Sequence, residues 1–326
     1  MTRTGNSRPR RALFHRAAAM RAKQASLFAA LPANVRGALW ILLAAVLFSM
    51  MVALVKFLGG RFDSMQVAFF RALTGLFFVV PLLVREGGAG FRTRRPWLHT
   101  ARGFAGATAM LCGFYALVHL PLADATAITF ARALFLVPLA ILLLRERVGV
   151  RRISATAVGF IGVLIMLNPT GELNSAALIA ALGAALVALA LTFVKLLSRT
   201  ESTLTLLFYS GMFGVLFTAI PAANVWIMPG WGDLALLLAM GTVGVAAHAC
   251  MIRGYSTAEA TALAPFDYTR LIFAGLIGYL VFADLPTWRT VLGAGIIVAA
   301  TLYITYREAR VKPRAARAPE RPHAEG

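Results

Sequence analysis

The sequence predicts an all-α polytopic membrane protein built from two inverted repeats. Its 326 residues are 60% hydrophobic and 14% charged, whereas soluble chains carry about 25% charged residues. Apolar runs of about 20 residues recur along almost the whole chain, and each is long enough to cross a bilayer as a helix. One short sequence phrase also occurs twice, which indicates an internal duplication.

Ten apolar runs follow one another with short loops between them, so we expect ten transmembrane helices and no large soluble domain. The spans fall near residues 37–58, 64–84, 98–119, 122–145, 152–168, 174–197, 203–222, 232–252, 260–283 and 288–306. Pro138 predicts a kink inside the fourth span, because a proline within a helix removes a backbone hydrogen bond.

The repeated phrase lies at the start of the fourth span and of the ninth. It reads Ala-Asp-Ala-Thr-Ala-Ile at 123–128 and Ala-Glu-Ala-Thr-Ala-Leu at 258–263. An apolar stretch follows each copy and carries one arginine, Arg132 in the first and Arg270 in the second. In duplicated membrane proteins, a ligand commonly binds where the two halves meet. The two arginines are therefore the leading candidates for a binding site.

Basic loops alternate with loops that hold few charges. Most basic loop residues lie at 85–95, 145–152, 195–199 and 253. The opposite loops hold only Arg61 and Arg289. Because basic loops face the cytoplasm, we expect both termini to be cytoplasmic. With five spans in each half, the second half is inverted, and Arg132 and Arg270 both fall near mid-depth.

Two repeats and two charged ends divide the chain. We place the first five-helix repeat at 36–168 and the second at 174–307. The stretch 1–35 is basic and has no acidic residue, which predicts a cytoplasmic arm that is disordered or lies at the membrane interface. We expect a disordered cytoplasmic tail at 308–326. These ends carry much of the +19 net charge, so the charge does not indicate nucleic-acid binding.

Charged residues inside the spans are candidate functional residues, because each costs about 2.5–3.5 kcal/mol to insert at a helix centre. They are Lys56, Arg71, Arg102, Arg132, Asp267 and Arg270. Lys56 and Arg102 lie near span ends, so we expect their side chains to reach lipid headgroups. For Arg71 two interpretations stay open, which are pairing with a helix carbonyl end and contact with a substrate.

Arg132 has no carboxylate one helical turn away on its own span. It needs a partner on another helix, water in a cavity or an anionic ligand, and we favour the cavity. Asp267 and Arg270 are three residues apart and can neutralise each other on one helix, so a structural role stays equally open for them. Asp267 is the only carboxylate well inside a span, which makes it the candidate for binding a coupled proton.

Three aromatic residues, Phe130, Tyr268 and Tyr115, accompany these charges. They could stack on a planar ligand, although packing is the default role of any single ring. The candidate substrate-binding set is therefore Arg132, Arg270, Arg71, Asp267, Tyr268, Phe130 and Tyr115. The sequence holds no phosphate loop and no HExxH, GxSxG or CxxC motif, so we expect no metal, no cofactor and no enzymatic activity.

Several phrases resemble the EamA type of the drug/metabolite transporter superfamily. Phe-Phe-Arg at 69–71 resembles an aromatic-Arg start of the second span, and Gly-Phe-Ile-Gly-Val at 159–163 resembles a fifth-span signature. The phrase at 123–127 with Leu-Arg-Glu-Arg at 144–147 resembles the fourth span of that family. The counterparts in the second half lie at 264–268 and 282–286, with Asp284 where the family usually has Glu. The resemblance covers about 36–307.

The resemblance implies a secondary transporter in a bacterial inner membrane. Members of the family move amino acids, nucleotide-like metabolites, vitamins, drugs and opine-type metallophores. The phrases are similar to a branch with S-adenosylmethionine carriers, riboflavin carriers and metallophore exporters. Basic residues at mid-depth favour a small anionic or zwitterionic metabolite that moves by alternating access. A multidrug or cation exporter, a non-transporting scaffold and a membrane-embedded enzyme are the alternatives. Substrate, direction, coupling ion and oligomeric state stay open.

Overall fold

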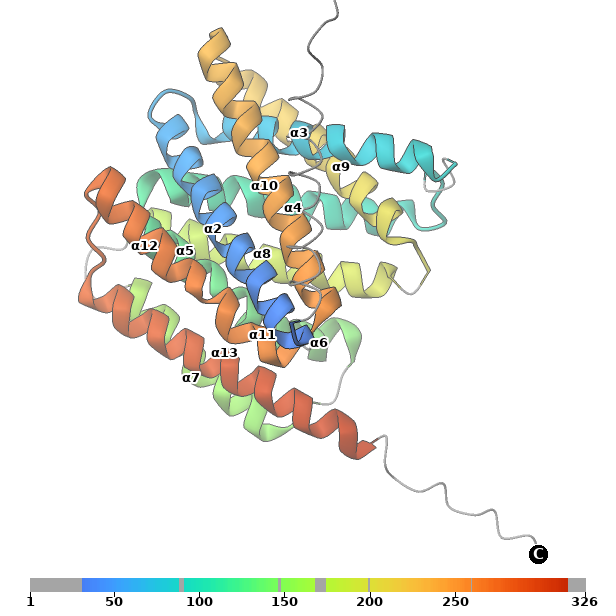
Figure 1. Cartoon of the computed structure of the whole chain (residues 1–326), viewed down its shortest axis with the longest axis vertical. Coiled ribbons are helices and arrows are strands. Elements are labelled where there is room, and N and C mark those ends of the chain that lie inside the picture. Colours follow the sequence, from blue (N-terminus) through green and yellow to red (C-terminus); the bar gives the residue numbers. More distant parts are fainter. Residues whose placement is uncertain are drawn as a thin grey trace, which may run out of the picture.

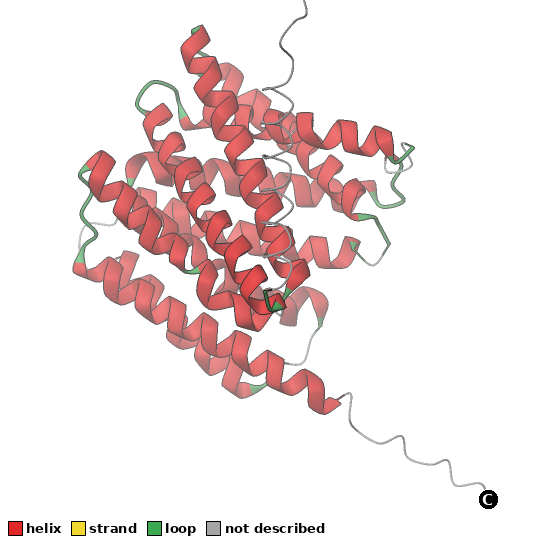
Figure 2. Cartoon of the chain, in the orientation of Figure 1, coloured by secondary structure: helices red, strands yellow, loops and turns green. Residues whose placement is uncertain are grey.

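The chain folds into a bundle of packed helices (Figure 1). The computed structural model describes residues 31–87, 91–145, 148–167, 174–198, 200–258 and 260–315. Every regular element in these ranges is a helix, as Figure 2 shows, which confirms the all-α prediction. Most of the predicted basic arm, Glu146 and the last part of the predicted tail lie outside the described residues.

The helices begin and end close to the predicted spans. They are α2 (Ala33–Gly59), α3 (Ser64–Arg85), α4 (Pro96–His119), α5 (Leu122–Phe130), α6 (Arg132–Leu144), α7 (Val150–Leu167), α8 (Ser175–Leu197), α9 (Thr203–Asn224), α10 (Trp231–Thr257), α11 (Ala260–Asp267), α12 (Thr269–Phe282) and α13 (Trp288–Ala315).

Eight spans in the described residues are long and apolar enough to cross a membrane, with α5 and α6 taken together as one. Helices α11 and α12 are each shorter, and α13 contributes a shorter apolar segment at Trp288–Ile304. The chain is therefore a multi-pass membrane protein, and the count of ten spans stays a prediction.

Side-chain caps fix where some of the helices begin. The Asp63 carboxylate accepts a hydrogen bond of 2.8 Å from the Met65 N–H at the start of α3. The Asn174 side-chain oxygen accepts a bond of 3.0 Å from the Ala176 N–H at the start of α8. These bonds satisfy backbone N–H groups that the first turn of a helix leaves without partners. The capping residues therefore help to set where α3 and α8 begin.

Two spans that we predicted as continuous helices are interrupted. The fourth breaks at Ala131, where the Ala131 N–H bonds the Ile128 carbonyl at 3.0 Å and the Leu134 N–H bonds the Ala131 carbonyl at 2.9 Å. These are i to i+3 bonds, which replace the regular α-helical pattern. Helix α6 continues through Pro138, so this interruption lies immediately before Arg132, seven residues before the proline, and the kink at Pro138 stays a prediction.

The ninth span breaks in the same way at Tyr268, between α11 and α12. The Leu271 N–H bonds the Tyr268 carbonyl at 3.0 Å, which is again an i to i+3 bond. Arg132 is the first residue of α6, and Arg270 is the second residue of α12. Both candidate arginines therefore start the second part of a broken helix, a form that transporters use at binding sites.

The helix pairs with the most extensive contacts follow the predicted duplication. Helix α2 packs on α10, and α4 packs on α8. These two pairs exchange when each span of the first half is replaced by its counterpart in the second half. The pairs α3 with α9 and α7 with α13 map onto themselves under the same exchange. Figure 1 shows α13 lying along α7 at one edge of the molecule. This pattern is what two related five-span halves produce around a common axis.

Candidate transport site

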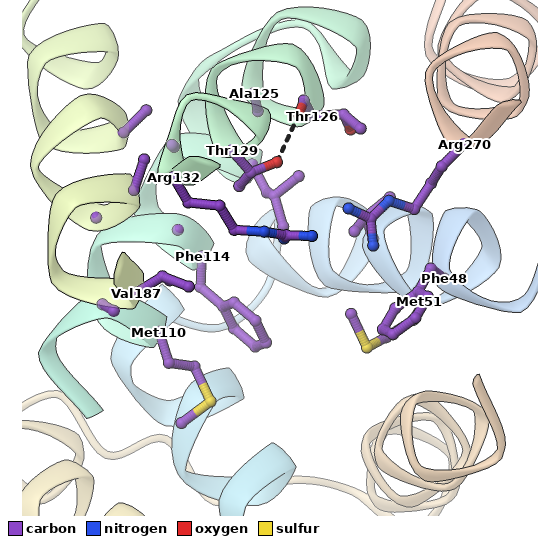
Figure 3. A pocket seen from close by; sticks show the side chains of 18 residues that line it. Phe48, Met51, Met110, Phe114, Ala125, Thr126, Thr129, Arg132, Val187 and Arg270 are labelled. Atoms are coloured by element: carbon purple, nitrogen blue, oxygen red, sulfur yellow. Dashed lines mark hydrogen bonds between the residues drawn. The ribbon is translucent and has the colours of Figure 1, made fainter. Parts of the chain in front are cut away.

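A cavity of about 180 Å³ lies between the two halves. Helices α2, α4, α5, α6, α8 and α12 contribute its walls, so both repeats and both broken helices take part. The larger side chains around it are Phe48, Met51, Met110, Phe114, Arg132 and Arg270, as Figure 3 shows. The walls are mostly apolar with a few convergent polar groups, which is typical of a small-molecule site.

Arg132 and Arg270 both line this cavity, as their places in the repeat suggest. In Figure 3 their guanidinium groups reach toward one another from opposite sides. The Arg132 side chain is 30% exposed, whereas Arg270 as a whole residue is 9% exposed. The Arg270 Nε is buried and has no hydrogen-bond partner among the described residues. An unsatisfied buried donor is costly, so a cavity ligand that accepts from Arg270 would remove that cost.

Asp267 lies near Arg132, with its Oδ2 3.9 Å from the Arg132 Nη2. One of the two open interpretations is that Asp267 and Arg270 neutralise each other along one helix. Instead, the helix breaks at Tyr268 between them, so the Asp267 carboxylate turns to the arginine of the other repeat. Two guanidinium groups thus share one nearby carboxylate, and the described side chains leave the cavity with excess positive charge.

Phe130 lies close to both arginines, although it is not among the residues that line the cavity. The Arg270 guanidinium carbon is 5.1 Å from the centre of this ring, and the Arg132 carbon is 5.8 Å from it. Arg270 is also 4.9 Å from the centre of Phe48. Cations over aromatic faces are attracted by the ring electrons within about 6 Å. The two rings therefore hold the guanidinium of Arg270 in place without consuming its hydrogen-bond donors.

The two predicted tyrosines occupy different places. The ring centre of Tyr268 lies 4.8 Å from that of Phe130, and its hydroxyl bonds the Thr301 hydroxyl on α13. Tyr268 therefore packs against Phe130 and links it to α13. Tyr115 instead stacks on His119, with ring centres 4.0 Å apart, and is not among the residues that line the cavity.

Arg71 lies beside the cavity and does not line it. Gly244 leaves room for this side chain, because a Cβ there would lie 2.7 Å from the Arg71 Nε and 2.6 Å from the Met51 Sδ. The Arg71 Nη2 is 3.4 Å from the His248 Nδ1. Since that nitrogen bonds the Gly244 carbonyl at 2.8 Å, it must carry the proton and cannot accept from Arg71. Arg71 therefore lies beside His248 and near Met51, and of these three residues only Met51 lines the cavity.

A second chamber of about 350 Å³ adjoins the first. The two share Ala109, Met110 and Val187 as wall residues, and the second extends along α4 to Arg102. The Arg102 Nη1 donates a hydrogen bond of 2.6 Å to the Leu206 carbonyl. Arg102 thus bonds a backbone carbonyl of α9 and lines this chamber, and its contact with headgroups stays a prediction.

Most cavity residues that the sequence did not single out are apolar or small. The exceptions are Thr126 and Thr129. The Thr129 hydroxyl donates a hydrogen bond to the Thr126 backbone carbonyl. Thr126 and Ala125 belong to the repeated Ala-Asp-Ala-Thr-Ala phrase. The duplication itself was therefore the available signal for this wall of the cavity. Within the described residues, no three His, Cys, Asp or Glu side chains come together as a metal site.

Broken helices in two related halves, with a charged cavity between them, define a membrane transporter. The family model of the EamA-like transporter family matches residues 35–168 and again 174–306. The chain belongs to this family, and it is a small-molecule transporter and not an enzyme.

Named relatives cover nearly all of the chain. It is 35% identical to an S-adenosylmethionine uptake transporter of Rickettsia prowazekii, over 86% of this chain and 95% of the relative. It is 32% identical to a riboflavin transporter of Rhizobium johnstonii, over 84% and 92%. It is 29% identical to the pseudopaline exporter CntI of Pseudomonas aeruginosa, over 82% and 95%. A solved crystal structure shares the fold, with a TM-score of 0.55 and 18% identity over 84% of this chain and 98% of that chain.

Proposed function

We propose that this protein is a secondary transporter that moves a small anionic or zwitterionic metabolite across a bacterial inner membrane by alternating access. One observation carries the proposal: an arginine from each repeat faces one cavity, and a single carboxylate, Asp267, lies near them. The uncompensated guanidinium group favours a substrate carboxylate or another anionic group. The two repeats at 36–168 and 174–307 would move against each other around this site.

The lining suits a metabolite with a charged end and a flat apolar end. Arg132 and Arg270 would bind the carboxylate, and the ring of Phe130 would help to hold both guanidinium groups in position. Met110 and Phe114 present soft apolar surface to a ring. S-adenosylmethionine has a zwitterionic amino-acid end, an adenine ring and a sulfonium group that makes its net charge positive. Because its carboxylate fits the arginine pair, it is the first substrate to test, in line with the name of the relative from Rickettsia.

The remaining candidates would act around this centre. Tyr268 would hold Phe130, and Arg71 would set the position of Met51 and His248. Tyr115 is the weakest member of the candidate set, because its ring faces His119. We also propose Asp267 as the site of a coupled proton, since its carboxylate lies 3.9 Å from the cavity arginine Arg132.

A multidrug or cation exporter is the second candidate function. It would need a buried carboxylate whose charge is free to attract a cation. Asp267 lies 3.9 Å from Arg132 and is 18% exposed, so a neighbouring cation already balances its charge. This arrangement favours the anionic or zwitterionic substrate.

The test is transport of labelled S-adenosylmethionine into sealed proteoliposomes, measured for uptake and for release. Arg132→Ala should abolish transport at normal membrane levels, because it removes the exposed half of the arginine pair. The control Arg253→Ala removes an arginine that stacks on Trp40 away from the cavity, and it should transport normally. Unchanged kinetics in Arg132→Ala would refute the site.

Asp267→Asn separates the remaining possibilities in the same vesicles. We expect it to keep exchange of substrate across the membrane and to lose accumulation against a gradient, because the coupled proton has no site. A cation exporter would instead lose all binding of its substrate when this carboxylate is neutralised.

A further inference from the structure

Lys56 and Asp284 form an ion pair between the two repeats, although 228 residues separate them in the chain. Lys56 lies in the last turn of α2, and Asp284 follows the C-terminal end of α12. Their side chains are only 14% and 20% exposed. The prediction that Lys56 reaches the headgroups is wrong, because its side chain turns inward to this carboxylate.

The pair also holds the junction between α4 and α5. The Lys56 Nζ donates a hydrogen bond of 3.0 Å to the Leu120 carbonyl, and the Leu122 N–H donates one of 3.2 Å to the Asp284 Oδ2. Leu122 is the first residue of α5, where the helix dipole favours a negative charge. One ion pair therefore ties together four helix ends, those of α2, α4 and α5 from the first repeat and that of α12 from the second.

The backbone fixes the Asp284 carboxylate in this position. Ala283 ends α12 with φ of 55°, a left-handed conformation that is uncommon for a residue with a side chain. The Ala283 N–H bonds the Tyr279 carbonyl at 3.2 Å, and the Asp284 N–H bonds the Gly278 carbonyl at 3.0 Å. The turn after α12 thus directs Asp284 toward the first repeat and away from the solvent.

The ion pair lies directly beyond one end of the cavity. Val52, Leu117 and Ala125 line the cavity on α2, α4 and α5. Val52 lies four residues before Lys56, Leu117 lies three before Leu120, and Ala125 lies three after Leu122. Each of these separations is about one helical turn. All three first-repeat walls therefore reach the ion pair within one turn. The second chamber extends from the cavity along α4 in the other direction, toward Arg102.

We propose that Lys56 and Asp284 form a lock that closes the transport cavity at this end, which our topology places at the periplasmic face. The proposal rests on alternating access, in which the cavity opens to each side in turn. The lock would break when the cavity opens to the periplasm and re-form when it closes there. A half-buried pair suits this role, because opening hydrates both charges, whereas removal of one partner leaves the other unpaired in the closed state.

The test measures access to the cavity and needs no substrate. In a variant with Cys112 and Cys250 replaced by alanine, Val52→Cys places a thiol on the cavity wall, and a membrane-impermeant maleimide is added from the periplasmic side. Lys56→Gln or Asp284→Asn should accelerate labelling about tenfold, or about 1.4 kcal/mol in the opening equilibrium. A thiol at Ala190→Cys in the second chamber should label more slowly from the cytoplasmic side. Lys56→Arg keeps the positive charge and a donor for the Leu120 carbonyl, so it should leave both rates near those of the unmodified pair.

The matched control is Arg61→Gln, which removes a second ion pair at the same end of the bundle. The Arg61 side chain is 56% exposed and pairs with Asp233 at 2.7 Å. Exposed pairs contribute little, so labelling should not change. The lock is refuted if neither single variant accelerates labelling, if Arg61→Gln accelerates it equally, or if the charge-keeping variant Lys56→Arg accelerates it as much as Lys56→Gln. Because labelling is independent of substrate identity, these results stand even where the proposed substrate fails to move.

Discussion

Arg132 and Arg270 occupy corresponding places in the two repeats, but their surroundings differ. Arg132 has a carboxylate 3.9 Å away and a side chain that is 30% exposed. Arg270 is buried between the faces of Phe48 and Phe130 and has an unbonded Nε among the described residues. A buried guanidinium that aromatic rings hold in position keeps its donors available. Arg270 is therefore suited to orient the substrate, and Arg132 is suited to attract it.

The substitution Arg270→Lys tests this difference. Lysine keeps the positive charge but lacks the flat guanidinium that lies over two rings. We expect KM for the substrate to rise about tenfold, or roughly 1.4 kcal/mol, with normal levels of protein in the membrane. The control is Arg289→Lys, because Arg289 stacks on Trp288 outside the cavity at 5.4 Å. A KM that stays the same in both variants would show that charge alone determines the role of Arg270.

The sequence identifies the charged members of the site and misses most of its walls. Charges stand out because lipid penalises them wherever they lie in an apolar span. Met110 and Phe114 do not stand out, because an apolar residue that faces a cavity has the same composition signal as one that faces a neighbouring helix. The partner of Lys56 is also hidden, since it lies 228 residues away in the chain.

At the scale of the helices, α7 and α13 make the closest backbone approach that the glycine positions reveal. A Cβ on Gly162 would lie 2.8 Å from the Gly293 carbonyl oxygen, and a Cβ on Gly293 would lie 2.6 Å from the Gly162 carbonyl oxygen. Small residues allow such contacts between membrane helices. The pair α7 and α13 packs against α5, α6 and α11, so it supports both broken helices from outside.

Gly162→Ala should therefore destabilise the protein. The added methyl group meets backbone, which cannot move aside as a flexible side chain can, and overpacking of this kind costs about 1–3 kcal/mol. We expect the apparent melting temperature in detergent to fall by at least about 3 °C. Gly295→Ala on α13 is the matched control, because a Cβ there meets nothing within 4 Å. Equal melting temperatures for both variants would contradict the close approach.

The positions of the helices are predictable from sequence, whereas their interruptions are not. Hydropathy locates spans well, because the lipid interior requires long apolar segments with internally satisfied backbone groups. The breaks at Ala131 and Tyr268 depend on a few i to i+3 hydrogen bonds. Neither residue is a glycine or a proline. Pro265 lies three residues before the second break and Pro138 seven residues after the first, so the prolines do not mark where the helices end.

At the scale of the whole molecule, the duplication produces two similar halves. They differ at Arg102, whose counterpart in the second half carries no charge. The offset of 135 residues that relates the two copies of the repeated phrase pairs Arg102 with Leu237. Leu237 is fully buried, whereas Arg102 lines the second chamber. Among the described residues, Arg102 therefore charges one end of the path, and the other end carries the Lys56–Asp284 lock.

This asymmetry predicts that Arg102 affects transport from one side. A substrate anion that enters along α4 meets Arg102 before it reaches Arg132, so Arg102→Gln should weaken binding from the predicted cytoplasmic side. We expect KM to rise about tenfold in inside-out vesicles and to change less than twofold in right-side-out vesicles. Without an ion gradient, net flux must be zero when the substrate concentration is the same on both sides of the membrane. The ratio of maximal rate to KM must therefore be the same for transport in either direction. The maximal rate from the Arg102 side should therefore rise together with KM.

Arg253→Gln is the control for this sided effect, because Arg253 lies toward the same face and stacks on Trp40 at 5.3 Å outside both chambers. It should leave KM unchanged from either side. An equal rise of KM on both sides in Arg102→Gln would mean that the residue acts on the shared cavity. A rise confined to right-side-out vesicles would mean that the chamber opens to the periplasm, which would reverse the predicted orientation of the chain. The same pair of measurements thus tests the role of Arg102 and the placement of both termini.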